Sequence, residues 1–459
     1  MRDPVDVLVV NAAELLTCVG VRRGPGLAEL EVLHDGGLAI TGGRIVAVGA
    51  SADLETRFDA TLRIDASGRL VSPSFVDAHT HLVHAGSRHD EWEQRATGVP
   101  RHGIDGGIRW SIARTREANE EVLRAQAIAN LDIALEHGTT VLEAKSGYGL
   151  DRDTELRLLR IASSLRHPVE VVPTYLGAHV LPPEYVDDRV AYIALVVDLL
   201  PQASRLARYC DVWVDPVAFT ADEARRISTA AQSHGMGVRL HADQTGPAGG
   251  SGLGAALGAS SVDHLECISD ADLALLGASD TVAIVLPAVT FHMTDQVPRL
   301  VDGIEQPPER PHLPSWCRRI IDSGAIVALA TDYNPGTCPT ISMQMVMQAA
   351  ARLYRMSYAE IWHAVTINAA HALDRSHRSG SLATGHDGDL IIWSVPEHGM
   401  VINRFGHNLV DQVLVGGRVM VAGGRRVMGS VDLGEQAAAQ RGDFRRLDGG
   451  GPDQIVEVL

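Results

Sequence analysis

Two histidines separated by one residue follow a short apolar run, and together they could bind a metal ion. The run Phe-Val-Asp-Ala-His-Thr-His at residues 75–81 predicts a β-strand that ends in His79 and His81. Since side chains alternate between the two faces of a strand, both imidazoles would point the same way. Two such imidazoles can bind one cation, with Zn–N distances of about 2.0–2.1 Å. Because the chain has 20 histidines, the pair could also be accidental, and further ligands must decide.

Further candidate ligands stand at the ends of three other strand-like runs. His241 ends one run, Asp263 and His264 end the next, and Asp332 follows Thr331 at the end of a third. Three neutral imidazoles and one carboxylate suit Zn²⁺, and Fe²⁺ is a second candidate. Such an ion would lower the pKa of a bound water to about 7. Asp332 could then orient that water and take its proton, while His264 could polarise or protonate the substrate, which together is metal-assisted hydrolysis.

These ligands can meet only if the strands that carry them share one edge of a sheet. Strands that alternate with helices predict a parallel sheet, and eight of them predict an α/β fold of the (β/α)8 TIM-barrel type. The active site of such a barrel lies at the C-terminal ends of the strands. The expected strands span residues 74–78, 139–144, 170–175, 211–214, 237–240, 260–263, 282–286 and 326–330, and the clearest helical segments span 117–136, 153–165, 191–207 and 221–233.

Both ends of the chain predict β-structure. Residues 36–40 and 44–49 form an expected hairpin near the start, and residues 389–393 and 411–420 predict strands near the end. Two ends of matching character predict one small discontinuous β-sandwich domain. We therefore expect three segments, namely 1–71 and 381–459 for the sandwich and tail, and 72–380 for the barrel. The tail after Val427 is charged and rich in glycine, and we expect it to be loose or a late helix.

Two long loops follow barrel strands and therefore belong at the expected catalytic mouth. One spans residues 83–108, and the other spans 289–313 and contains Pro307 and Pro308. Each loop either has no role in the reaction or forms a lid over the substrate.

Charge and cysteine content exclude some classes of partner. The 459 residues carry a net charge of −17, which argues against binding to nucleic acid or to an anionic membrane. Residues 1–20 are too short and too interrupted by charge for a signal peptide or a membrane span. The five cysteines are odd in number and widely spaced, which predicts reduced thiols in the cytoplasm.

Lys145 is the only lysine among 40 basic residues. Either the composition is biased towards arginine and this lysine remains by chance, or its position needs a compact ammonium because a planar guanidinium does not fit. Both interpretations stay open from the sequence.

Six motifs resemble the amidohydrolase superfamily and, within it, the imidazolonepropionase family. The resemblance covers nearly the whole chain, from residues 10–13 to 417–419. Lys-Ser-Gly-Tyr-Gly-Leu and Asp-Tyr-Asn-Pro-Gly are more specific than the His-x-His pair. The motifs lie at residues 77–83 with 86–88, 145–150, 176–179, 241–243, 263–265 and 332–340.

The resemblance implies a role for each matching residue. It implies one Zn²⁺, or Fe²⁺ or Fe³⁺, per chain, and a homodimer. Tyr148 could instead only pack in its turn, and His179 could only cap a helix. The implied metal ligands are His79, His81, His241 and Asp332, and the implied substrate-binding residues are Arg88, Tyr148, His179, Asn334, Gly336 and the hydroxyl of Thr337, with Arg88 suited to a propionate carboxylate.

The sequence departs from the family pattern at the expected mouth. Gln244 stands where the family has a glutamate, and an amide cannot shuttle a proton as a carboxylate does. Arg101 aligns with a family tyrosine, so a cation replaces a phenol in the expected pocket. The stretch before Trp316 is longer than in the family, and Asp215-Pro216 replaces a version that contains glutamate. Gln244 and Arg101 therefore bear on catalysis and substrate choice.

The leading hypothesis is a hydrolase that opens 4-imidazolone-5-propanoate to N-formimino-L-glutamate. Hydrolysis of another five-membered ring with an acidic arm is the alternative, such as a hydantoin, thiohydantoin or lactam, and Gln244 favours it. A non-catalytic metal-binding ligand sensor is a third hypothesis, which the intact set of ligands argues against. A site with two metals would need a carboxylated lysine on strand four, whereas Lys145 lies on strand two, so we expect one ion.

Overall fold

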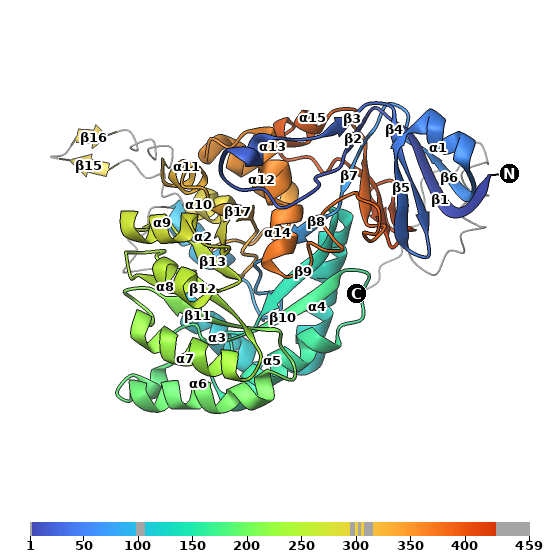
Figure 1. Ribbon diagram of the computed structural model, residues 1–459. Coiled ribbons are helices and arrows are strands. Elements are labelled where there is room, and N and C mark those ends of the chain that lie inside the picture. Colours follow the sequence, from blue (N-terminus) through green and yellow to red (C-terminus); the bar gives the residue numbers. More distant parts are fainter. Residues whose placement is uncertain (1, 98–105, 294–298, 302–303, 307–314, 428–459) are drawn as a thin grey trace, which may run out of the picture.

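Eight parallel strands form the centre of the computed structural model, which describes residues 2–97, 106–293, 299–301, 304–306 and 315–427. The residues of the barrel strands are mostly buried, and β14 and β17 are wholly apolar, as a parallel sheet covered by helices requires. The order of the strands in the sheet follows the chain, which confirms the predicted barrel (Figure 1). The strands are β8 (Phe75–Asp77), β9 (Thr139–Lys145), β10 (Glu170–Ala178), β11 (Tyr209–Val214), β12 (Gly237–Ala242), β13 (Ser261–His264), β14 (Val282–Val285) and β17 (Ile326–Leu329).

The barrel is closed between its first and last strands by the segments that follow them. Thr80 forms a parallel bridge with Tyr333. The Tyr333 carbonyl accepts a hydrogen bond of 2.8 Å from the His81 amide, and the Asp332 amide donates one of 2.9 Å to the His79 carbonyl. The predicted strand 75–81 therefore ends earlier, at Asp77, and the two histidines lie just beyond it.

Helices surround the barrel and begin at polar caps. The side chains of Asn119, Asp151, Asp188 and Thr220 each accept a hydrogen bond from the first turn of a helix. The helices of the barrel region are α2 (His89–Ala96), α3 (Ile108–Glu117), α4 (Glu120–Glu136), α5 (Arg152–Ser164), α6 (Arg189–Ala203), α7 (Ala221–Ser233), α8 (Gly250–Leu257), α9 (Asp270–Gly277), α10 (Pro287–Met293), α11 (Ser315–Asp322), α12 (Met343–Leu353), α13 (Tyr358–Ala364) and α14 (Ile367–Ala372).

Two predicted helix boundaries are wrong for local reasons. The expected helix 117–136 is the end of α3 followed by α4, because Asn119 caps the N-terminus of α4 and interrupts the run. The expected helix 191–207 begins earlier, at Arg189, where Asp188 provides the cap, and it ends at Ala203.

The two ends of the chain build two further sheets. In the four-stranded sheet, β1 (Asp3–Ala12) pairs with β4 (Gly36–Thr41) and β6 (Phe58–Asp65), and β4 pairs with β5 (Arg44–Ala50) in the predicted hairpin. The seven-stranded sheet joins early and late segments, because β7 (Leu70–Pro73) pairs with β18 (Leu390–Trp393). Its other strands are β2 (Glu14–Leu16), β3 (Val32–Leu33), β19 (Val410–Val415), β20 (Arg418–Ala422) and β21 (Arg425–Arg426).

The sheets pack face to face as the predicted β-sandwich. Val9 and Ile40 of the four-stranded sheet share a buried cluster with Leu15 and Ile392 of the other. In Figure 1 the first strands, in blue, lie beside the last ones, in red, to one side of the barrel. Helix α1 (Ser51–Arg57) packs against strands of the four-stranded sheet, and α15 (His398–Asn403) follows β18. The domain boundaries at 72 and 381 remain a prediction, and the expected behaviour of the tail after Val427 lies outside the described residues.

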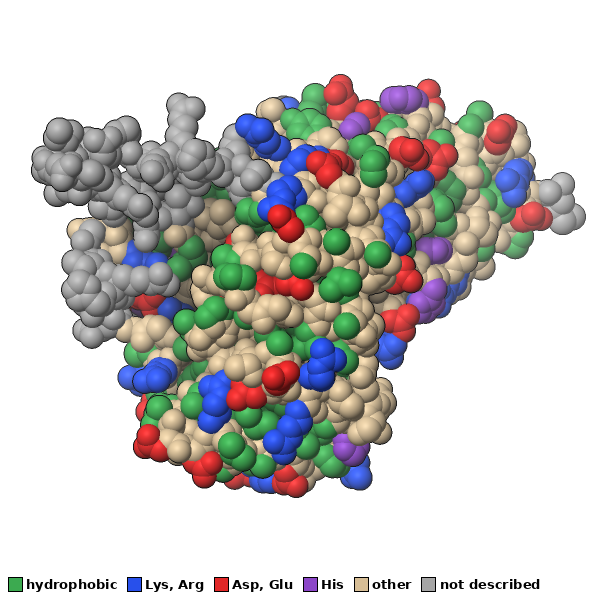
Figure 2. Space-filling model, turned by 60° about the vertical axis from the view of Figure 1, so that its left-hand side comes forward, with side chains coloured by type: hydrophobic (Ala, Val, Ile, Leu, Met, Phe, Trp, Pro, Cys, Tyr) green, Lys and Arg blue, Asp and Glu red, His purple; other side chains and the backbone are tan. Residues whose placement is uncertain are grey.

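Charges of both signs are mixed on the molecular face drawn in Figure 2. All five cysteines are unpaired, and four of them are buried. No helix in the described part of the chain is long and apolar enough to cross a membrane.

Candidate metal centre

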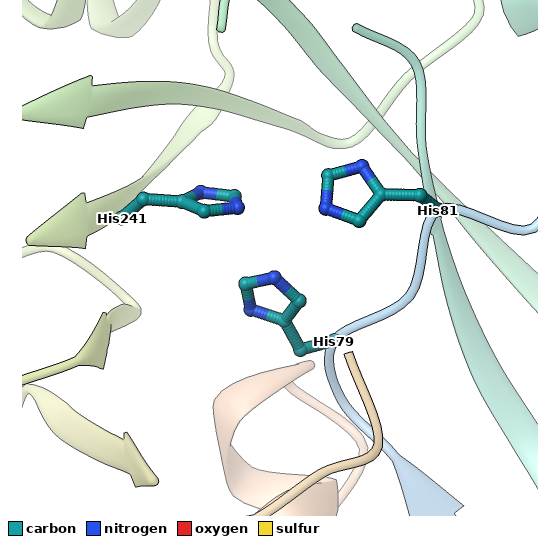
Figure 3. A group of neighbouring side chains, drawn as sticks. All are labelled: His79, His81 and His241. Atoms are coloured by element: carbon teal, nitrogen blue, oxygen red, sulfur yellow. The ribbon is translucent and has the colours of Figure 1, made fainter. Parts of the chain in front are cut away.

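Three imidazoles point toward one another at the C-terminal end of the barrel. His79 and His81 come from the segment after β8, and His241 comes from β12 (Figure 3). One ring nitrogen of each lies within 4.8 Å of the others. All three side chains are buried, with 0–3% of the residue exposed. The sequence prediction that these three residues meet is therefore consistent with the geometry.

Asp332 completes the group because the closure of the barrel places it beside the two early histidines. Its Oδ1 lies 3.4 Å from His79 Nε2 and 3.3 Å from His81 Nε2. Its Oδ2 lies 4.0 Å from Nε2 of His264, the last residue of β13, which is the strand next to β12. Three histidines and one carboxylate thus surround one small volume, with a fourth histidine at its edge.

Carboxylates contact the Nδ1 atoms of two of the imidazoles, on the side away from the centre of the group. Asp263 Oδ2 lies 2.6 Å from His79 Nδ1, and Asp211 Oδ2 lies 3.0 Å from His241 Nδ1. With a carboxylate at Nδ1, each ring presents Nε2 toward the centre. Burial opposes protonation of His79, but Asp263 outweighs it and raises the pKa of His79 to about 9. Burial lowers the pKa of His241 well below its usual value.

A buried set of charged side chains lies beneath the histidines. Lys145 Nζ is 2.7 Å from Asp211 Oδ2, 2.9 Å from Glu143 Oε2 and 3.5 Å from Asp263 Oδ2. Arg239 lies 2.9 Å from Glu143 and 3.5 Å from Asp263. All five side chains are fully buried, and they comprise three carboxylates and two cations. One carboxylate is therefore in excess directly below the histidine group.

The donor atoms of the group fit a metal ion. His79 Nε2, His241 Nε2 and Asp332 Oδ1 are buried and have no hydrogen-bond partner among the described residues. Unpaired buried polar atoms destabilise a fold unless something binds them. Nitrogen donors together with a carboxylate oxygen suit zinc or iron, and the excess carboxylate beneath them favours a cation. A metal ion thus accounts for atoms that the protein alone leaves unpaired.

Residues at the strand ends around this group adopt a left-handed backbone. The φ angles are 54° at Asp243, 83° at His264, 75° at Leu265 and 54° at Asp332. In residues other than glycine, a strained conformation of this kind costs about 1–3 kcal/mol. Such conformations persist where the surrounding structure enforces them, and they are common at functional sites.

A cavity of about 240 Å³ opens onto the metal group. It brings together most of the residues that the sequence predicts for the site. Its lining comprises His81, Arg88, Arg95, Ile108, Tyr148, His179, Trp213, His241, Gln244, His264, Met293, Asp332, Asn334 and Thr337.

Tyr148 and His179 form one wall beside His81. The rings of His179 and His81 are stacked with centroids 5.1 Å apart, and Tyr148 meets both rings edge-on. His179 Nδ1 lies 2.9 Å from the Gly147 carbonyl, which can only accept, so Nδ1 carries the hydrogen. Burial lowers the pKa of His179 to about 3, so the ring is neutral at neutral pH. His179 therefore follows β10 and faces the cavity, and it does not cap a helix.

Arg88 lies across the cavity, and Glu91 fixes its guanidinium. Arg88 Nε and Nη2 donate to the two oxygens of Glu91 over 2.6 and 2.7 Å. Arg95 donates to the same carboxylate over 3.2 Å. Two guanidiniums thus share one carboxylate, which leaves a positive charge at this wall. The inner edge of Arg88 packs on Gly336, where a β-carbon would overlap its Nη1 and lie 2.8 Å from its Nε.

The loop after β17 is shaped by the side chain of Asn334. Its amide donates to the Asp332 carbonyl and to the Thr337 hydroxyl, each over 2.7 Å. Its oxygen accepts from the backbone amides of Gly336 and Thr337 over 2.9 and 2.7 Å. Within the protein, Asn334 thus orders the loop that carries Asp332, and Thr337 reaches the cavity.

Gln244 lines the cavity just after β12. The carboxylate of Asp215 accepts hydrogen bonds from the backbone amides of Gln244 and Thr245 over 3.1 and 2.8 Å. Asp215 therefore fixes the loop that carries Gln244. Both residues are departures from the family pattern. Arg101 lies outside the described residues, as does most of the loop 289–313. Of that loop, α10 brings Met293 to the cavity, and β15 (Arg299–Val301) pairs with β16 (Ile304–Gln306).

Sequence reasoning missed the charged residues beneath the histidines and the support of Arg88. Glu143, Asp211 and Arg239 are charged residues at buried positions inside barrel strands. A charge inside a strand that is buried on both faces needs a partner, and that signal could have identified them. Glu91 and Arg95 gave a weaker signal, since charges at helical spacing are common on exposed faces.

Comparisons with known proteins identify the family and the fold. Residues 70–420 match the model of the amidohydrolase family. The chain is 40% identical over 435 residues to an imidazolonepropionase of Geobacillus thermodenitrificans, covering 91% of this chain and 99% of that one, and 39% identical to one of Geobacillus kaustophilus with the same coverage. The fold is similar to an adenosine deaminase from Xanthomonas campestris solved with bound zinc, with a TM-score of 0.64 at 18% identity over 96% of this chain and 99% of that one.

Proposed function

The chain belongs to the amidohydrolase family and is a metal-dependent, imidazolonepropionase-like hydrolase of a cyclic C–N bond, and on that premise we propose that it opens 4-imidazolone-5-propanoate to N-formimino-L-glutamate. The observation that carries this proposal is the pairing of two features in one cavity. A metal group of histidines and Asp332 stands on its floor, and the fixed cation of Arg88 stands on its wall. A small ring with an acidic arm matches both features.

We assign the metal to one Zn²⁺ or iron ion per chain, held by His79, His81, His241 and Asp332. When bound, such an ion supplies Lewis acidity and lowers the pKa of a water molecule. Asp332 Oδ2 faces away from His79 and His81 and can accept the proton of the attacking water. Nε2 of His264 lies 4.0 Å from that oxygen and can donate a hydrogen bond to the ring carbonyl.

The remaining walls orient the substrate. Arg88 binds the arm through donors that Glu91 leaves free, and Thr337 lies in the same wall. Tyr148 and the Nε2 atom of neutral His179 bind the ring side, since Nδ1 of His179 is already engaged. Gln244 hydrogen-bonds the substrate but cannot carry a proton, so proton transfer falls to Asp332 and His264.

A second candidate substrate is a hydantoin or lactam that carries the same acidic arm. Gln244 favours it, because a ring whose carbonyl is activated by the metal and His264 needs no further carboxylate. The resemblance also supports a homodimer, and the five unpaired cysteines support a cytoplasmic location.

Turnover with purified protein tests the proposal. Imidazolone-propionate, hydantoin-propionate and a lactam with the same arm are each incubated with enzyme, and products are identified by mass spectrometry. We expect N-formimino-L-glutamate from the first and a kcat/KM at least about tenfold above the other two. Faster opening of the hydantoin would transfer the assignment to that ring, and no ring opening at all would refute the proposed activity.

A further inference from the structure

The structure suggests a function for the only lysine of the chain, which the catalytic proposal does not use. Lys145 lies at the end of β9, and its side chain is fully buried. Three carboxylates surround its ammonium, at 2.7 Å for Asp211, 2.9 Å for Glu143 and 3.5 Å for Asp263. Burying a charge this deeply is costly, so a stable fold alone gives little reason to keep it.

Two of these carboxylates are the ones that contact metal-binding imidazoles. The same Oδ2 atom of Asp211 lies 2.7 Å from Lys145 Nζ and 3.0 Å from His241 Nδ1. The same Oδ2 atom of Asp263 lies 3.5 Å from Lys145 Nζ and 2.6 Å from His79 Nδ1. One ammonium is thus connected to two ligands from different strands.

We propose that Lys145 is a positioning residue, whose ammonium holds the carboxylates of Asp211 and Asp263 where they fix His241 and His79, and which thereby tightens binding of the metal. Without it, three carboxylates would share the single cation of Arg239, and their mutual repulsion would displace them. Carboxylates behind ligating histidines typically contribute 10- to 100-fold to metal affinity.

A second interpretation of Lys145 predicts the opposite change in metal affinity when the ammonium is removed. A positive charge close to the centre repels a cation, so its removal would tighten metal binding if repulsion were its main effect. A purely structural role predicts a lower stability of the fold with an unchanged affinity. The three interpretations therefore differ in the direction of one measured quantity.

The test is zinc affinity of the full-length protein, without substrate. Wild type and Lys145→Met are freed of metal with a chelator, and Zn²⁺ affinity is measured by competition with a chromophoric chelator. Glu360→Gln is the control, because it removes a buried carboxylate that pairs with Arg318 away from the centre. We expect Lys145→Met to bind Zn²⁺ about 10- to 100-fold more weakly, and Glu360→Gln to bind it like wild type.

An affinity of Lys145→Met within twofold of wild type, or tighter, would overturn the proposal. If this variant does not fold, Asp211→Asn and Asp263→Asn break the same connection one side at a time, and wild-type affinity in both would overturn it equally. The inference rests on the proposed function only in that a metal occupies the centre. Since no substrate is used, its failure is distinct from failure of the proposed ring opening.

Discussion

Substituting Gly336 by alanine should disable recognition of the acidic arm without touching the metal centre. The φ angle of Gly336 is not positive, so alanine suits its backbone and acts only through its β-carbon. That carbon would overlap Nη1 and Cζ of Arg88, whose side chain is only 9% exposed. To make room, the guanidinium must move and give up its paired hydrogen bonds with Glu91.

The size of the effect follows from the charged hydrogen bond that the substrate would lose. Such a bond contributes about 1.5–3 kcal/mol, and each 1.36 kcal/mol corresponds to a factor of ten. We therefore expect kcat/KM of Gly336→Ala to fall about 10- to 150-fold for the acid substrate. For the same ring with a carboxamide arm we expect little change.

Steady-state kinetics with both substrates measure this difference, and Gly49→Ala provides a control because no heavy atom lies within 4 Å of its added β-carbon. An unchanged kcat/KM for the acid would show that Arg88 does not bind the arm. Equal losses for acid and amide would show that the loop matters in some other way, and either result refutes the reasoning.

Three further variants test other parts of the site. Asp332→Asn should lower turnover at least about 100-fold while thermal unfolding shows an intact fold, and retained turnover would remove it from the mechanism. Gln244→Glu should speed imidazolone opening if the amide merely replaced a proton carrier, and no gain would favour another substrate. Burial lowers the pKa of His84 to about 4 from 6.5, so the unfolded chain binds more protons between these values. Stability should therefore fall as pH drops from 6.5 to 4, by up to about 1.4 kcal/mol per unit, and urea unfolding of His84→Gln should show a shallower fall.

The fold could be predicted because local sequence and tertiary structure agree in the barrel. Residues 282–286 and 326–330 are apolar runs between helical segments, and a strand buried on both faces requires that pattern. The hairpin 36–49 was predictable from its glycine turn. Helix boundaries were less predictable, because a cap such as Asn119 divides a helical pattern that the hydrophobic period alone joins.

The grouping of the proposed metal ligands could be predicted because each stands at a strand end, and barrel topology brings strand ends together. The arrangement of the charged residues beneath them could not be predicted. Asp211 and Lys145 lie on strands that are not adjacent along the chain, and only coordinates show that the carboxylate stands between the ammonium and His241. The family resemblance singled out Gln244 and Arg88, which both line the cavity, but the acid that fixes Arg88 comes from a helix whose charges resemble those of any exposed surface.

The burial of the only lysine determines how this protein reacts with reagents for primary amines. No other side chain of the sequence carries a primary amine, so the folded chain offers such reagents no lysine on its surface. Lys145 reacts only when the barrel opens far enough to admit the reagent. The rate at which Lys145 is labelled would thus report opening of the core around the candidate metal centre.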